Sequence, residues 1–109
     1  GELKHGTIAL IEEGTPVIAI ATQEELFEKM VSNMQEVKAR GAYVIAVAQE
    51  HNKEVEKAAD KVIYIPNVDD ILSSILTVLP LQLLSYYVAV QRGCDVDKPR
   101  NLAKSVTVE

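Results

Sequence analysis

The sequence is poor in cysteine, in aromatic residues and in basic charge. It has one cysteine, Cys94, no tryptophan, and only 5% aromatic residues in 109 positions. A single cysteine cannot pair within the chain, so a disulfide scaffold is excluded, and the free thiol suits a reducing, cytoplasmic location. The 11 basic side chains are outnumbered by 16 acidic ones, for a formal net charge of −5, and they form no cluster. We therefore expect no nucleic-acid partner.

The remaining composition is that of a globular domain. Hydrophobic residues make up 48% of the chain and charged residues 25%, which excludes a disordered acidic tail. The length allows one domain at most. The chain opens on Gly-Glu-Leu-Lys-His, with neither an initiator methionine nor a basic-then-apolar leader. We therefore expect a piece of a longer protein.

Three short runs are apolar throughout and rich in β-branched residues. They cover Val17–Ala21, Tyr43–Ala48 and Val62–Ile65. A strand with one wet face would alternate apolar and polar residues, whereas continuous apolar runs are typical of parallel strands that are covered on both faces. The sequence therefore predicts an α/β fold with a parallel sheet and flanking helices.

The segment between the first two runs carries helix signals. Thr22 with Glu25 has the spacing of a capping box, and Arg40 with Gly41 supplies a stop. Between them, apolar residues recur at the spacing of one helical face, namely Leu26, Phe27, Met30, Val31, Met34 and Val37. The second connection, residues 49–61, has fewer apolar positions and predicts a short helix with Asn52 as a cap.

Residues 71–90 contain no charged side chain and are long enough to span a bilayer. The segment nevertheless contains Pro80 and several hydroxyl side chains, and acidic and basic residues flank it. We therefore expect no membrane span but a helix kinked at Pro80, with its apolar sides buried in a core or an oligomer interface. Residues 94–109 lack helical periodicity and are expected to form an extended tail.

Common cofactor and metal motifs are absent. There is no G-x-G-x-x-G after a strand and no G-x-x-x-x-G-K-[ST], so neither a dinucleotide site nor a phosphate loop is supported. His5 and His51 are far apart and belong to no Cys/His grouping with metal-ligand spacing. No cofactor or metal is expected.

Several single residues could carry chemistry, but each has a simpler explanation. His5 could shuttle protons near neutral pH, although such a histidine is more often a surface or packed residue. His51 is expected to be solvated, and Cys94 to be structural. Lys104 could form a Schiff base only if its amine were desolvated, and a lysine near a terminus is usually a solvated charge. The acidic residues that could transfer protons, most simply explained as solvated, are Glu2, Glu12 and Glu13.

The two ends of the chain carry more specific motifs. The opening Gly-Glu-Leu-Lys-His-Gly is followed by Ala9–Ile11, and the chain closes on Gly-Cys-Asp-Val-Asp-Lys-Pro-Arg-Asn-Leu-Ala-Lys-Ser-Val-Thr-Val-Glu, residues 93–109. With Leu79–Leu84 and Tyr86, these motifs resemble the carboxyl-terminal part of the glucosamine-6-phosphate synthase family, the glutamine:fructose-6-phosphate aminotransferases. The likeness covers essentially the whole chain and is loosest between residues 23 and 68. Thr7 stands where proline is common in the family.

The resemblance implies a fold and a division of the chain. Residues 1–92 would be the C-terminal portion of the second sugar-isomerase (SIS) domain, a flavodoxin-like fold whose last three strands are present here. Residues 93–109 would be a catalytic tail. In this family a glutaminase domain of the same chain supplies ammonia from glutamine, and the isomerase domains convert fructose 6-phosphate into glucosamine 6-phosphate.

The resemblance also implies site residues. The family histidine matching His5 assists sugar ring opening and reaches the site of the partner subunit in a homodimer. The family lysine matching Lys104 forms an imine with the open-chain sugar, which Ala103 and Lys104 would contact. The isomerisation base and the phosphate loops would lie outside these 109 residues, so we expect the isolated chain to be inactive.

Two other functions stay open from the resemblance. One is a non-catalytic SIS module that binds a sugar phosphate and regulates another domain, and the other is a deglycase acting on fructosamine phosphates. A sensor would need no imine-forming lysine, so the presence of both His5 and Lys104 favours the synthase.

Overall fold

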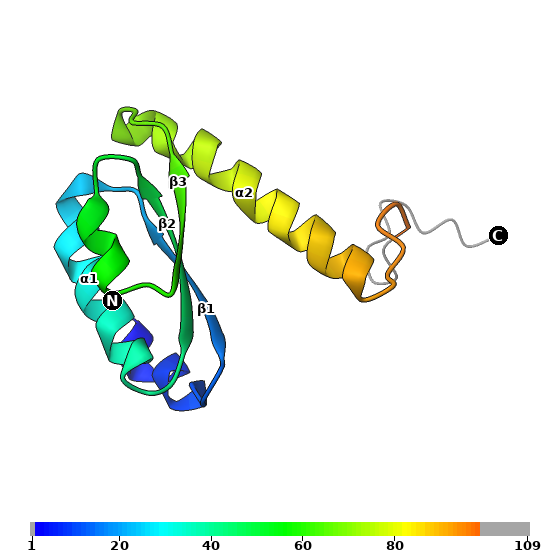
Figure 1. Cartoon of the computed structure of the whole chain (residues 1–109), viewed down its shortest axis with the longest axis horizontal. Helices are drawn as coiled ribbons and strands as arrows, with labels where there is room; N and C mark the ends of the chain where they lie inside the picture. Colours follow the sequence, from blue (N-terminus) through cyan, green and yellow to red (C-terminus); the bar gives the residue numbers. More distant parts are fainter. Residues whose placement is uncertain (1, 99–109) are drawn as a thin grey trace. The chain divides into compact units, whose positions relative to one another are not determined.

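The computed structural model describes residues 2–98, which fall into two compact units. The first unit ends at Thr77 and the second begins at Val78. The first unit contains a sheet of three parallel strands in the order β1-β2-β3, shown in Figure 1. The strands are β1 (Pro16–Ala21), β2 (Tyr43–Gln49) and β3 (Lys61–Ile65). The predicted α/β fold with a parallel sheet is confirmed, and each predicted run forms a strand.

The main helix of the first unit, α1 (Phe27–Lys38), packs on one face of the sheet against β1 and β2 (Figure 1). The strand residues on that face are small: Ala19 of β1 is paired with Ala46 of β2, and Ala21 with Ala48. Small side chains let the helix approach the sheet closely, so that Met34 and Val37 of α1 become almost fully buried.

The opposite face of β1 is open in this chain. Ile18 is 44% exposed and Ile20 is 43% exposed, whereas Val47 of the central strand β2 is fully buried. The expectation that all three strands are covered on both faces is therefore wrong for β1. The physical reason is that, within residues 2–98, β1 is an edge strand with α1 on one side only.

The predicted capping box does not form. The chain passes from β1 into a short 3-10 turn, η3 (Glu24–Leu26), and the α-helix starts only at Phe27. Leu26 occupies the N-cap position without a side-chain cap. Thr22 lies before this turn and is buried, and its carbonyl oxygen accepts a hydrogen bond from Gln49. Because the helix begins a turn later than the sequence pattern indicates, Thr22 cannot reach its first amides.

The second connection forms a 3-10 helix, η4 (Lys53–Lys57), which confirms a short helix. Val55 of this helix and Ala58, which follows it, are fully buried in the hydrophobic core. Asn52 precedes η4 but makes no capping hydrogen bond. Its side chain instead lies 3.5 Å from Glu24 Oε2.

The last helix, α2 (Asp70–Gln91), contains Pro80 and spans both units. The hydroxyls of Ser73 and Thr77 are buried and bond to carbonyl oxygens one turn earlier, each at 2.7 Å. Most large apolar side chains of α2 are exposed, with Ile71 at 88%, so the burial expected in a core is not found among residues 2–98. By length and composition α2 could also cross a bilayer, but core helices of soluble proteins meet the same criterion.

Gly41, in the turn after α1, and Gly14, before β1, both have a positive φ but differ in how closely their surroundings pack. Gly41 has a φ of 92°, which agrees with its predicted role as a helix stop, and Gly14 has a φ of 79°. A Cβ at Gly41 would lie 2.9 Å from Glu13 Cα, whereas a Cβ at Gly14 would meet nothing within 4 Å. Gly14→Ala should therefore isolate the backbone strain, at about 1–2 kcal/mol.

We expect Gly41→Ala to lower the free energy of unfolding by more than Gly14→Ala does, because it adds a clash with backbone to the same strain. Denaturant unfolding of both variants beside the wild type measures the difference. Equal losses would show that the turn relaxes around the added methyl group.

Candidate functional site

His5 lies on a short 3-10 helix, η1 (Leu3–His5), that is anchored to the first unit by its neighbours. Leu3 packs against the core, and Lys4 Nζ lies 2.8 Å from Glu36 Oε1 of α1. The His5 side chain itself is 73% exposed, and its Nδ1 atom lies 3.2 Å from Glu2 Oε2. The opening motif thus exposes an imidazole to solvent on a short helix that is anchored to the first unit.

The other residues predicted for the sugar site, Ala103 and Lys104, lie outside the described residues. Of the remaining candidates, Cys94 is exposed, as are Glu12 and Glu13. Residues 2–98 contain no group of three or more His, Cys, Asp or Glu side chains placed to hold a metal ion. Of the candidates within residues 2–98, the structure brings Glu2 into contact with His5.

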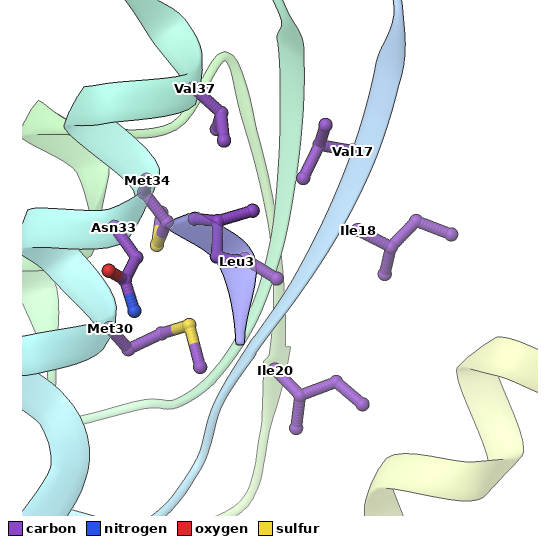
Figure 2. Close-up of a pocket in the computed structure, with 9 residues that line it drawn as sticks. Leu3, Val17, Ile18, Ile20, Met30, Asn33, Met34 and Val37 are labelled. Carbon is purple, nitrogen blue, oxygen red and sulfur yellow. The ribbon is translucent and has the colours of Figure 1, made fainter. Parts of the chain in front are cut away.

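An apolar hollow of about 250 Å³ lies beside β1. Figure 2 shows Met30 and Met34 of α1 pointing towards Leu3, while Ile18 points away from α1 on the far side of the strand. The lining residues are apolar except for Asn33. With no titratable group in its lining, this hollow offers packing surface and no acid, base or nucleophile.

The carboxyl ends of the strands carry the densest set of polar contacts. Gln49, the last residue of β2, is 2% exposed and joins the segments that follow its two neighbouring strands. Its Nε2 donates to the Thr22 carbonyl oxygen after β1 at 2.9 Å, and its Oε1 accepts from the Val68 amide after β3 at 2.8 Å. One buried amide thus holds three segments at this edge.

His51 makes a second connection at the same edge, nearer to solvent. Its Nε2 lies 3.0 Å from Glu24 Oε2, and its Nδ1 lies 2.7 Å from Asn67 Oδ1. The contact with Glu24 raises the pKa of His51 above its usual 6.5, and the Asn67 oxygen adds to this effect. The same contact lowers the pKa of Glu24 below 4.5, with a smaller contribution from Asn52. His51 is solvent-exposed, as predicted, but it also makes two side-chain contacts that the sequence did not indicate.

Two open depressions flank His51. One, of about 520 Å³, is lined by Gln49, His51, Asn67 and the start of α2, and the other, of about 360 Å³, by η3, the start of α1 and η4. In open parallel sheets, ligands bind outside the carboxyl ends of the strands, which is where both depressions lie. The polar residues that follow each predicted strand are a sequence signal that could have indicated this cluster.

These features belong to a known class of domain. The SIS domain model matches residues 1–92, and the chain therefore belongs to the SIS domain family. The fold agrees with the solved C-terminal domain of glucosamine-fructose-6-phosphate aminotransferase from Francisella tularensis, at a TM-score of 0.81 and 40% sequence identity. That match covers 88% of this chain and 27% of the solved one.

Curated relatives carry a more particular name. Proteins named glutamine--fructose-6-phosphate aminotransferase [isomerizing] match all 109 residues, with 68% identity in Caldanaerobacter subterraneus subsp. tengcongensis and 63% in Clostridium acetobutylicum. The Thermus thermophilus relative is 58% identical over the same length. The chain spans about 18% of the length of these relatives and corresponds to their C-terminal part. The resemblance stated from the end motifs is confirmed.

Replacing Gln49 tests whether its two hydrogen bonds hold this edge together. Gln49→Ala leaves the buried Thr22 carbonyl and the half-buried Val68 amide without their partner, and an unsatisfied buried group costs about 1–3 kcal/mol. We expect a clear loss in the free energy of unfolding, measured by urea denaturation. Gln35→Ala, an exposed glutamine on α1, is the matched control and should change stability by less than about 0.5 kcal/mol. A loss no larger than that of the control would contradict the role of Gln49.

Proposed function

We propose that the chain forms part of the isomerase site of a glutamine:fructose-6-phosphate aminotransferase, which converts fructose 6-phosphate and ammonia from glutamine into glucosamine 6-phosphate. The observation that carries this proposal is 58–68% identity over all 109 residues to relatives named for that reaction. The glutaminase domain of the same polypeptide would supply the ammonia. The protein would act in the cytoplasm and need no cofactor.

In this proposal Lys104 is the imine-forming residue. Its neutral amine adds to the carbonyl carbon of the open-chain sugar and water leaves; ammonia later displaces the lysine. A lysine amine is nucleophilic only when it is unprotonated, which a desolvated site favours. A closing tail over bound sugar would exclude water and bring the amine, with Ala103 beside it, into range of the substrate.

His5 is the proposed proton-transfer group for sugar ring opening, acting in the site of the partner subunit of a homodimer. Two features of the first unit support this role. The imidazole is exposed and thus accessible to a second chain, and the Lys4–Glu36 ion pair with the packing of Leu3 anchors the short helix that carries it. A histidine that acts across an interface must be accessible to the partner subunit, and the backbone that carries it must be held in place.

The role of Lys104 is tested by trapping the imine in the full-length protein. We expect Lys104→Ala to abolish borohydride trapping of fructose 6-phosphate, because no amine remains at that position to form the reducible bond. Mass spectrometry of the treated protein detects the adduct. Lys98→Ala, which removes an exposed lysine six residues earlier, is the matched control and should trap sugar as the wild type does. Undiminished trapping in Lys104→Ala would remove that residue from the mechanism.

The shared site is tested by mixing inactive subunits. If His5 acts on the partner's sugar, a mixed dimer of His5→Ala and Lys104→Ala chains contains one site with both residues intact. Random mixing should therefore restore roughly a quarter of the wild-type activity, since half of the dimers are mixed and each has one competent site of two. Each variant alone stays inactive. Mixed dimers that form and recover no glucosamine 6-phosphate synthesis would contradict the shared site.

A further inference from the structure

We propose that protonated His51 is a clasp that ties together the segments following β1, β2 and β3, and that this clasp opens when the imidazole loses its proton. The three segments contribute one contact each: Glu24 after β1, His51 after β2 and Asn67 after β3. This inference is independent of the proposed reaction, because it concerns a conformational equilibrium at the edge of the sheet.

The geometry of the ring requires the charged form. Both ring nitrogens of His51 face oxygen atoms, Nε2 the Glu24 carboxylate at 3.0 Å and Nδ1 the Asn67 side chain at 2.7 Å. A carboxylate only accepts hydrogen bonds, and so does an amide oxygen. A neutral imidazole has one N–H group and can satisfy one of the two contacts, whereas the imidazolium donates to both.

The orientation of the Asn67 amide is fixed by the backbone. The His51 amide N–H also donates to Asn67 Oδ1, at 3.1 Å. If the side-chain amide of Asn67 were reversed, its NH2 group would face this N–H, and two donors would meet. Asn67 Oδ1 therefore stays an acceptor towards His51, and the Nδ1 contact needs a proton on the ring.

Charged groups around the clasp come from every neighbouring segment. The adjoining depressions and the chain next to His51 are predominantly acidic. Their charged residues are Glu24 and Glu25 from η3, Glu28 and Lys29 from α1, Glu50 immediately before His51 in sequence, Lys53 and Glu54 from η4, and Asp69 before α2. This excess of carboxylates favours the cation. Glu24 is the carboxylate in direct contact, so it decides the strength of the clasp.

The direction of the pH effect follows from the raised pKa of His51. A group whose pKa is higher in the folded chain stabilises the fold fully below its unfolded value of about 6.5 and ceases to do so as the pH rises through the folded value. The clasp is thus closed in mildly acidic solution and opens on the alkaline side. Gln49, buried and neutral, keeps its contacts in both states, so the opening is local.

Hydrogen exchange tests the clasp. Mass spectrometry of the full-length protein measures exchange at the histidine rings and at the backbone amides between pH 5 and 9. We expect the imidazole of His51 to titrate above the ordinary histidine value of 6.5. After correction for intrinsic exchange, backbone exchange of the peptide containing His51 should rise about 1.4- to 5-fold as the ring deprotonates, the range expected for an exposed charged contact.

Two variants separate the clasp from a general pH effect. Glu24→Gln should lower the pH at which His51 titrates, whereas Glu25→Gln, which removes a neighbouring charge without a contact to the ring, should change it less. His51→Gln should abolish the pH-dependent step in backbone exchange. The proposal is overturned if the two glutamate variants titrate alike, or if the step persists in His51→Gln.

Discussion

Parallel pairing of β1, β2 and β3 is the constraint on which the rest of this structure depends. Because all three strands run the same way, a return connection must join each strand to the next, and the carboxyl ends of the strands meet at one edge. The return after β1 places α1 on the alanine-rich face and forms the core. The polar residues after the strands meet as a consequence, and buried Gln49 satisfies backbone groups that the strand ends leave unpaired.

Much of the fold could be predicted from local sequence patterns. The three apolar runs identified the strands, and the apolar spacing over residues 26–37 identified α1, because burial against a sheet imposes that spacing. Gly41 was correctly placed after the helix, since its positive φ is a local requirement. The false capping box shows the limit of such patterns: Thr22 is drawn into a buried contact with Gln49, a partner 27 residues away.

The polar cluster at the edge of the sheet was missed for the same reason. His51 has unremarkable neighbours in sequence, and its two side-chain partners are 27 and 16 residues distant. Only the parallel topology brings them together. The functional assignment came from different information, the unusually specific motifs at the chain ends, and their likeness to a family could be recognised without knowing any distance. Hydrophobic periodicity alone predicted only an α/β domain, because it says nothing about which side chains react or bind a ligand.

The open side of β1 affects how this domain folds when many copies of the chain are present. Over residues 2–98, the outer edge of β1 has no neighbouring strand, and Ile18 and Ile20 lie exposed beside it. Such an edge is a template on which any extended chain can add a strand, including another copy of the same sequence. Correct pairing within one polypeptide does not depend on concentration, whereas pairing between copies does. The yield of folded domain should therefore depend on how crowded the newly made chains are.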